Sequence, residues 1–164
     1  MNKFYFIFFI ALLGFSQDLF GQNSITDQIY RNITEELENF SHFEDLGGAI
    51  IYEKDNLTLS LGHLRNDSLH VITLEKVIKG NRSTFQLLDT LNFVSKSKKY
   101  NTDLIECDDI NNKNRKMIFG FYQYEEDKEY FEKIVFAWTV ILPDLLMKEI
   151  NSEGIKCENI GYGI

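Results

Sequence analysis

The alternation of hydrophobic and polar residues is clearest between residues 116 and 142. In the second half of this stretch, one alternating set of side chains is apolar except for Glu132: Tyr130, Ile134, Phe136, Trp138, Val140 and Leu142. The opposite set is also mostly apolar, a pattern typical of a strand in the middle of a sheet. A shorter alternating run at 117–124 precedes it, and the charged residues 125–129 lie between the two runs. The pattern therefore predicts a long antiparallel hairpin within a β-rich core, with the acidic segment at its tip.

Period-two patterns separated by polar turns predict further strands along the rest of the chain. They lie at residues 49–53, 57–64, 69–78, 83–93, 103–108, 145–150 and 155–159. The run at 83–93 also suits a short helix, because Leu87, Leu88 and Leu91 lie at helical spacing. The run at 57–64 has one apolar and one polar face, which predicts a hairpin strand with one face toward water. Together these runs predict one twisted antiparallel sheet of about six to eight strands in meander order.

The segment after residue 24 has the spacing of an amphipathic helix. Ser24 can cap its N-terminus, and Gly47 and Gly48 follow its expected end. One apolar stripe recurs at helical spacing and comprises Ile25, Ile29, Ile33, Leu37 and Phe40. A helix of about 16 residues would bury this stripe by packing across the sheet. The expected fold class is therefore α+β, with an N-terminal amphipathic helix packed on a twisted antiparallel β-sheet.

The first 21 residues have the layout of a secretory signal peptide. A positive start at 1–3 precedes a run of about 12 apolar residues at 4–15, which is too short for a bilayer that needs roughly 20 helical residues. Cleavage would fall after Ser16 or after Gly21, and an uncleaved N-terminal anchor is the alternative. The mature chain, 22–164, would then be a single secreted or periplasmic domain with no stable membrane span. The abundance of Asn, Ile, Lys and Phe is typical of an AT-rich bacterial genome.

Charge and cysteine content narrow the possible partners and the compartment. The net charge of −8 argues against nucleic-acid binding, which needs a basic surface, and the short basic run at 96–99 is expected to be a solvated turn. Cys107 and Cys157 predict one disulfide in an oxidising compartment, with two separate buried thiols as the alternative. Closing a loop of about 50 residues would contribute roughly 4 kcal/mol in the chain-entropy model. No His or further Cys lies at ligand spacing from either cysteine, so no metal site and no cofactor are predicted.

His63 and His70 flank a polar turn that contains Asp67. With the turn centred between Asn66 and Asp67, the two histidines would lie opposite each other near the end of a hairpin. Two imidazoles and a carboxylate could bind a metal ion or transfer protons. The simpler interpretation, two exposed histidines at a hairpin end, is favoured. The oxygen-rich segment 108–114 lacks the spacing of a calcium-binding loop and is expected to be a plain loop.

No motif of a known enzyme class is visible, neither a serine nucleophile elbow nor a phosphate-binding loop, a dinucleotide fingerprint or a zinc-protease helix. Residues 116–142 are unusually rich in aromatic side chains. Those at the less apolar positions of this stretch, Tyr122, Tyr124 and Tyr130, are therefore predicted to form a binding surface. The predicted function is an exported, non-catalytic binding protein whose partner is another protein or a small apolar ligand. The alternative is a small envelope hydrolase with an unrecognised acid/base site, for which His63 and His70 are the candidates.

Overall fold

The computed structural model is nearly all β. It describes residues 25–80, 82–95, 100–159 and 161–162, so the predicted signal peptide at 1–21 lies outside the described residues. Strands account for 59% and helical residues for 5% of the described residues, and no described helix reaches seven residues. Within the same residues, no helix is long and apolar enough to span a bilayer.

The first half of the chain forms a five-stranded antiparallel sheet, here called sheet A. Its strands lie in the spatial order β1 (Ile29–Tyr30), β5 (Thr84–Val94), β4 (Leu69–Ile78), β3 (Leu57–Asn66) and β2 (Glu44–Lys54). From β2 to β5 the connections are hairpins, because each strand pairs antiparallel with its neighbour in sequence. The β2–β3 turn is formed by Asp55 and Asn56, both with positive φ, as two-residue hairpin turns require. The predicted meander is therefore confirmed for this half.

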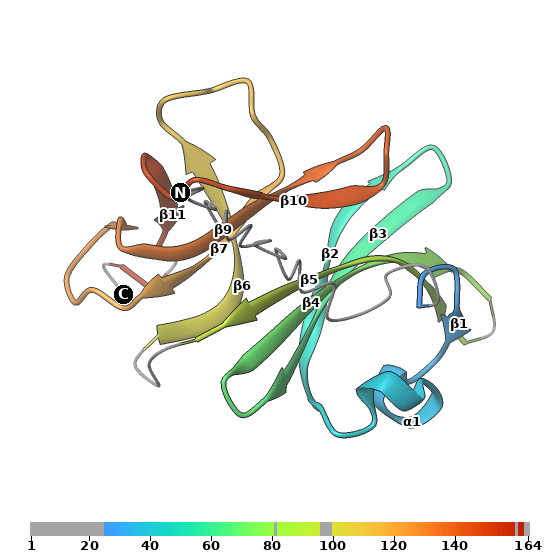
Figure 1. Ribbon diagram of the computed structural model, residues 1–164. Helices are drawn as coiled ribbons and strands as arrows, with labels where there is room; N and C mark the ends of the chain where they lie inside the picture. The colour runs from blue at the N-terminus through green and yellow to red at the C-terminus, as the bar shows by residue number, and fades with distance from the viewer. Residues whose placement is uncertain (1–24, 81, 96–99, 160, 163–164) are drawn as a thin grey trace, which may run out of the picture.

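The second half forms a six-stranded antiparallel sheet, sheet B. Its strands lie in the order β10 (Leu146–Ile150), β9 (Ile134–Ile141), β7 (Ile118–Gln123), β6 (Tyr100–Asp109), β11 (Ile155–Glu158) and β8 (Tyr130–Phe131). The last strand in sequence, β11, is inserted between β6 and β8. Figure 1 shows sheet A on the right and sheet B on the left and top, with β10 crossing above β5. The prediction of a single sheet is therefore wrong.

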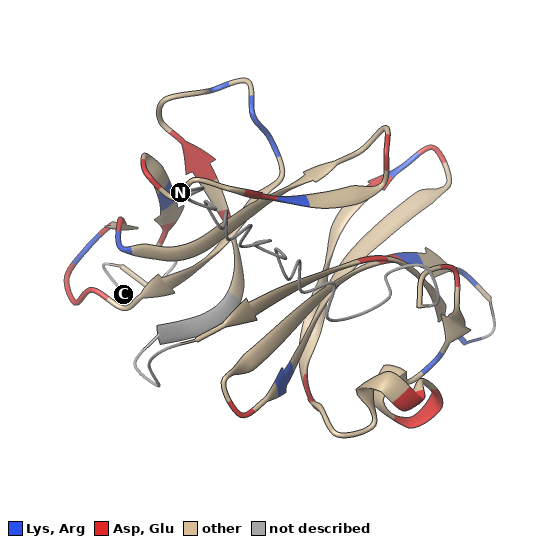
Figure 2. Cartoon of the chain, viewed as in Figure 1, with Lys and Arg blue, Asp and Glu red and all other residues tan. Residues whose placement is uncertain are grey.

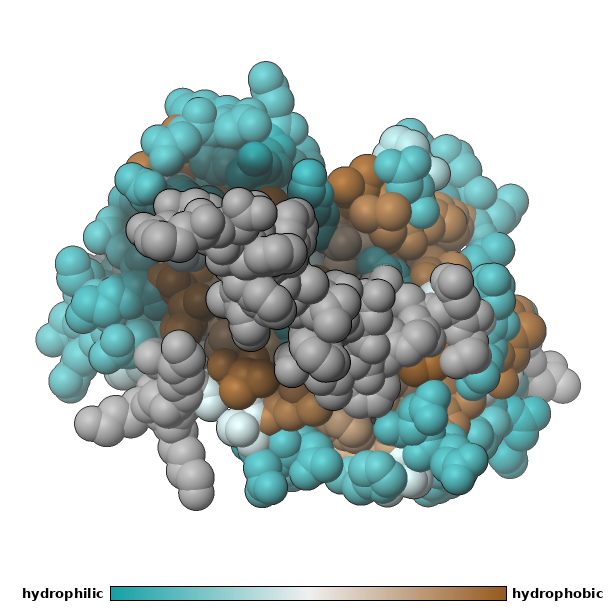
Figure 3. Space-filling model, in the orientation of Figure 1, coloured by the Kyte–Doolittle hydropathy of each residue, from teal (hydrophilic) through white to brown (hydrophobic). Residues whose placement is uncertain are grey.

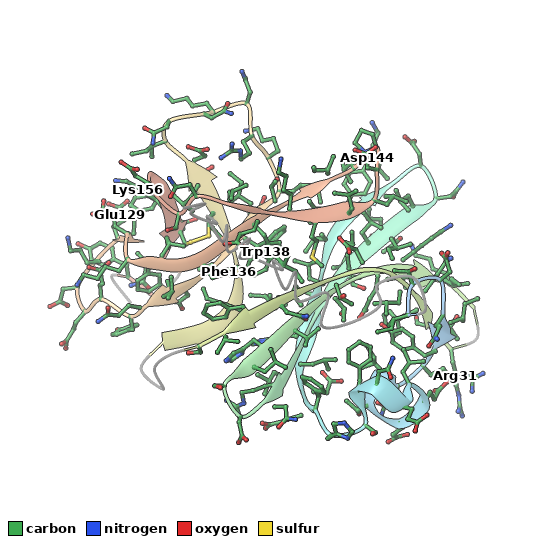
Figure 4. All side chains as sticks on the ribbon, in the orientation of Figure 1. Arg31, Glu129, Phe136, Trp138, Asp144 and Lys156 are labelled. Carbon is green, nitrogen blue, oxygen red and sulfur yellow. A yellow bond between two sulfur atoms is a disulfide. The ribbon has the colours of Figure 1, made fainter. Side chains whose placement is uncertain are left out.

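The hairpin predicted at 116–142 is confirmed and supplies half of the core between the two sheets. β7 and β9 pair so that Phe119 lies opposite Trp138, and Phe121 lies opposite Phe136. These side chains share one face and pack against residues of β3 and β4: Leu59, Leu61, Ile72 and Leu74. Phe136 and Trp138 lie between the sheets in Figure 4. The second strand is not continuous, however, because residues 130–131 leave β9 and pair with β11 as β8.

The predicted N-terminal helix is wrong, and with it the α+β fold class. Asn32 caps a helix of only four residues, α1 (Ile33–Glu36), by accepting a hydrogen bond from the Thr34 amide through its side chain. Leu37 then adopts an extended backbone, φ −107° and ψ 108°, which ends α1 before the 3-10 turn η2 (Glu38–Phe40). Upstream, residues 29–30 are held as β1 by pairing with β5. Strand pairing at one end and an extended residue at the other therefore override the helical spacing.

Part of the predicted apolar stripe still reaches the sheet. Ile33, Leu37 and Phe40 are buried together with Tyr30 against the face of sheet A that points away from sheet B, whereas Ile29 is 61% exposed. The partners on the sheet are Leu64, Val71 and Leu87. β3 is consequently covered on both faces, so the face of residues 57–64 that was expected to be wet is buried, while β2 at the sheet edge is largely exposed.

The predicted disulfide is confirmed. Cys107 of β6 lies directly opposite Cys157 of β11, and the two are bonded. The bond crosses two neighbouring strands of sheet B and is drawn as a yellow bond in Figure 4. Both cysteines are buried beside Ile118, Ala137 and Ile155.

Polarity follows this architecture. Charged residues gather at hairpin ends and loops, whereas the strands that meet between the sheets are largely uncharged (Figure 2). In the space-filling view, hydrophilic residues make up most of the outer margin of the visible face, and hydrophobic patches show between them (Figure 3).

Removing the disulfide is expected to destabilise the protein strongly. The bond closes a loop whose ends are 50 residues apart, for which the chain-entropy model gives about 4 kcal/mol. We expect the free energy of unfolding of the double variant Cys107→Ser, Cys157→Ser, measured by urea denaturation, to be lower than that of wild type by a large part of this contribution. Wild-type protein unfolded with and without a thiol reductant is the control, and equal midpoints in both conditions would contradict the prediction.

Candidate functional site

A cavity of about 400 Å³ lies between sheet A and the segment that carries β1 and α1. We call it the Glu75 cavity, after the buried glutamate that lines it. Its apolar wall includes Ile33, Leu64, Val77 and Phe85, and its polar residues include Ser60 and Thr73. A volume of this order is typical of sites that enclose small molecules.

Two glycines on neighbouring strands line this cavity at points where other atoms of the protein approach closely. Gly48 of β2 lies opposite Gly62 of β3, and both line the cavity. A Cβ on Gly62 would lie 2.5 Å from Thr73 Oγ1 and 2.7 Å from Glu75 Oε1, and one on Gly48 would lie 2.3 Å from the Leu61 carbonyl oxygen. Neither position accepts a side chain, because such distances are far below van der Waals contact. Glycine inside a strand commonly marks such a close approach.

The regular alternation of β4 directs Glu75 into the cavity. β4 pairs with β3 without a register shift, so Glu75 lies directly opposite Ser60 and shares a face with Thr73 of its own strand. The register shift in this region is in β5, where Leu88 is skipped between the pairs Leu74–Asp89 and Glu75–Leu87.

The Glu75 carboxylate is buried and held by hydroxyl groups. Its side chain belongs to a residue that is only 7% exposed. Ser60 Oγ donates to Oε2 at 3.1 Å, and Thr73 Oγ1 donates to Oε1 at 2.5 Å. Burying a carboxylate costs free energy unless hydrogen bonds or a counter-charge compensate it, and here two hydroxyls provide part of that compensation.

Tyr30 of β1 adds a third hydroxyl to the same cavity. The residue is 3% exposed, and its ring stacks on Phe85 with centroids 5.9 Å apart. Its hydroxyl group makes no hydrogen bond of normal geometry, although it lies near the Glu75 carboxylate and can donate toward it. Burial, and after it the negative charge of Glu75, raises the pKa of the Tyr30 hydroxyl far above its usual value of 10.0. Tyr30 is therefore neutral at physiological pH and can offer both a donor and an acceptor.

The rim of the Glu75 cavity carries one charge of each sign. Arg31 and Asp45 both line it, and both residues are exposed. The Asp45 carboxylate accepts a hydrogen bond from the Gly47 amide at 2.8 Å, which fixes its position. Arg31 lies at the outer edge of the molecule in Figure 4, with its side chain directed outward.

The two predicted histidines are brought together, although not as expected. The β3–β4 turn is centred one residue later than predicted, so His70 lies opposite Arg65 and His63 lies opposite Ile72. The histidines are therefore diagonal neighbours on one face, and His63 Nε2 and His70 Nδ1 are 2.9 Å apart in a hydrogen bond. Both residues are buried, so the expectation of exposed histidines is wrong.

The histidine pair lies in the core between the sheets, on the opposite face of sheet A from the Glu75 cavity. The ring of His63 packs against Phe121, and the ring of His70 packs against Phe93 and Phe121. Asp67, the predicted acidic partner, is exposed in the turn. Among the described residues, no group of three or more His, Cys, Asp or Glu could hold a metal ion.

The three predicted binding tyrosines lie in different environments. Tyr122 is buried and stacks on Phe131 with centroids 4.0 Å apart. Tyr124 is 59% exposed and Tyr130 is 38% exposed, with Lys156 Nζ lying 5.9 Å from the Tyr130 ring centroid. A role of Tyr124 and Tyr130 in binding stays a prediction.

The oxygen-rich segment 108–114 comprises the last two residues of β6 and the loop that follows, which Asp109 holds in place. This buried carboxylate accepts hydrogen bonds from the amides of Asn111 and Asn112 and from the Arg115 guanidinium at 2.7 Å. Its oxygens are therefore occupied by the protein's own donors, in agreement with the plain loop expected from the sequence.

Two features of the sequence are consistent with the Glu75 cavity, but neither predicts it without the structure. A glycine inside an alternating strand, Gly62, points to a close approach on that face. A glutamate within a β-branched strand, opposite a serine, is compatible with a buried polar cluster as well as with a solvent-facing side chain. Which interpretation holds depends on whether another segment covers that face, and the segment at 29–40 does.

We expect Gly62→Ala to disturb the Glu75 cavity. The new methyl group would collide with Thr73 Oγ1 and Glu75 Oε1, both already engaged in hydrogen bonds. Overpacking of this kind costs about 1–3 kcal/mol of unfolding free energy, measurable by urea denaturation. Gly80→Ala is the matched control, because its nearest neighbour would be the Arg82 carbonyl oxygen at an ordinary 3.5 Å. Equal losses in the two variants would contradict the prediction.

The histidine pair is expected to make stability depend on pH. Burial, and after it the charge of Arg65, lowers the pKa of His70 below its ordinary value of 6.5. The unfolded chain then binds a proton more readily than the folded chain, so the free energy of unfolding is highest above pH 6.5 and falls as the pH drops below it. Urea denaturation from about pH 8 to about pH 5 should show a shallower decline for His70→Gln than for wild type. The exposed His42→Gln is the control, and an unchanged slope in His70→Gln would refute the assignment.

No protein family model, curated protein or solved structure matches this chain. The fold and the geometry of the Glu75 cavity are therefore the grounds on which its function can be proposed.

Proposed function

We propose that this chain is an exported, non-catalytic binding protein that takes a small ligand in the Glu75 cavity. The cavity volume, about 400 Å³, falls in the range of small-molecule sites. Its walls combine apolar side chains with a few polar groups. In small-molecule sites the apolar lining encloses the ligand, and the polar groups fix its orientation.

The observation that carries the proposal is the buried polar cluster of Glu75, Ser60, Thr73 and Tyr30. A strand position between two covering layers is normally filled by an apolar side chain, because a buried carboxylate costs stability. The fold nevertheless holds Glu75 there, with a glycine that makes room for it and two hydroxyl donors. Retaining a carboxylate and a buried tyrosine hydroxyl beside a cavity supports a role in recognising a ligand.

Export is supported by two independent features. The Cys107–Cys157 bond is of the kind that persists in oxidising compartments such as the periplasm or the extracellular space. The sequence at 1–21 has the layout of a signal peptide.

The alternative of a small hydrolase draws little support from His63 and His70. Their rings are buried among Phe93 and Phe121, and Asp67 is in the exposed turn. A general base has to reach a substrate proton within hydrogen-bond distance. His63 does line a cavity of about 360 Å³ beside Arg65, but the residue is only 3% exposed, which limits access to its ring.

The proposal is tested by a fragment screen observed in ¹H–¹⁵N spectra of the purified protein. Small neutral, cationic and anionic fragments at millimolar concentration are expected to shift the amides of Gly48, Gly62 and Thr73, which surround the cavity. Val77→Phe should weaken binding at least about tenfold, because the added ring occupies the cavity.

Val94→Phe is the matched control, since Val94 is an exposed valine of β5 outside the cavity. If none of the fragments shifts these amides, or if Val77→Phe binds as well as Val94→Phe, the proposed function is wrong.

A further inference from the structure

We propose that the ligand of the Glu75 cavity is a cation, namely a small molecule that places a protonated amine against the Glu75 carboxylate. This inference rests on the proposed function, since it requires that the cavity binds a ligand. It adds the chemical class of that ligand and the group that recognises it.

The first argument is the charge of the cavity. Of the ion pairs formed by described residues, none includes Glu75. The one basic residue on the described rim is Arg31, which is exposed and directed outward in Figure 4. Asp45 adds a second carboxylate to the rim. The interior charge is therefore negative and lacks a protein counter-charge, and a ligand cation would supply one.

The second argument is the unused hydrogen-bonding capacity of Glu75. Each carboxylate oxygen accepts one hydroxyl, from Ser60 and from Thr73. An ionised carboxylate offers about four lone-pair sites, so acceptor capacity is left beyond these two hydroxyls and the nearby Tyr30 hydroxyl. Ser60 and Thr73 hold the carboxylate in one orientation without neutralising it. An ammonium group, with three donors and a positive charge, suits such an acceptor.

The third argument is the Tyr30 hydroxyl. It is buried beside the same cavity and makes no hydrogen bond of normal geometry. Because the hydroxyl stays protonated, it contributes no further negative charge and can accept a hydrogen bond from a ligand N–H. Glu75 and Tyr30 approach the cavity from different layers, one from the sheet and one from the segment covering it. An amine between them would join the two layers.

The apolar wall of the cavity determines the chemical character of the part of the ligand that does not carry the amine. Ile33, Leu64, Val77 and Phe85 offer hydrocarbon surface and no charge. A compact apolar body that carries one amine fits this combination, whereas an anionic ligand would meet the repulsion of Glu75 and Asp45.

The inference is tested with three matched probes, 2-phenylethylamine, 2-phenylethanol and 3-phenylpropionate, which are cationic, neutral and anionic at neutral pH. Affinities are measured by titration calorimetry, and the site by the shifts of the Gly62 and Thr73 amides. We expect the amine to bind about 10- to 100-fold more tightly than the alcohol, as a charge-assisted hydrogen bond implies. The anion should bind more weakly than either.

Glu75→Gln keeps the shape of the side chain and removes its charge, so it should abolish the preference for the amine. Glu158→Gln is the control, because Glu158 is an exposed carboxylate of β11 in the other sheet, and this variant should retain the preference. The comparison of the three probes on wild-type protein decides the question even if Glu75→Gln does not fold.

The outcomes separate the two proposals. If the alcohol or the anion binds as tightly as the amine, or if Glu75→Gln retains the preference, the cation inference is overturned while the binding function stands. If none of the three probes shifts the Gly62 and Thr73 amides, the binding function itself fails, and the inference fails with it.

Discussion

Strands β3 and β4 are covered on both faces, and much of the remaining structure follows from this constraint. One face meets the aromatic hairpin of sheet B, and the other meets the segment from β1 to η2. A polar side chain on either face must therefore find a hydrogen-bond partner inside the protein. The histidine pair satisfies this requirement on one face, and the cluster of Ser60, Thr73 and Glu75 satisfies it on the other.

The two polar clusters differ in what surrounds them. His63 and His70 pack against aromatic rings, so this pair is expected to affect stability and its dependence on pH. On the opposite face Gly62 leaves room for the side chain of Glu75, which borders a cavity. The same central strand, β4, thus carries a histidine toward one layer and the proposed recognition group toward the other.

Much of the strand layout is predictable from the sequence, because period-two alternation reports directly on burial. β4 occupies the predicted 69–78, and the faces of the β7–β9 hairpin are those expected. Alternation does not report which strands pair, however. Contacts between residues distant in sequence determine three features: the division into two sheets, the position of β11 between β6 and β8, and the pairing of residues 130–131 with β11.

The failures have local physical causes. The helical spacing of residues 25–40 reflects a need for burial, which a short helix, a 3-10 turn and a strand also meet. A difference of one residue in the turn centre changes the pairing of His63 with His70 from opposite to diagonal. Glu75 could not be assigned to an interior because a glutamate in a strand normally faces water. Only the covering segment makes it a buried residue.

The position of β11 also bears on the order in which the chain can assemble. All strands of sheet A lie between residues 29 and 94, so this sheet can form while the rest of the chain is still emerging. Sheet B cannot be completed in that way, because β11, at residues 155–158, is the strand that joins β6 to β8 and brings Cys157 to Cys107. Until then the aromatic face of the β7–β9 hairpin and the exposed edge of β6 belong to an unfinished sheet, the kind of surface that invites aggregation. Residues 155–158 are thus the ones that close the structure.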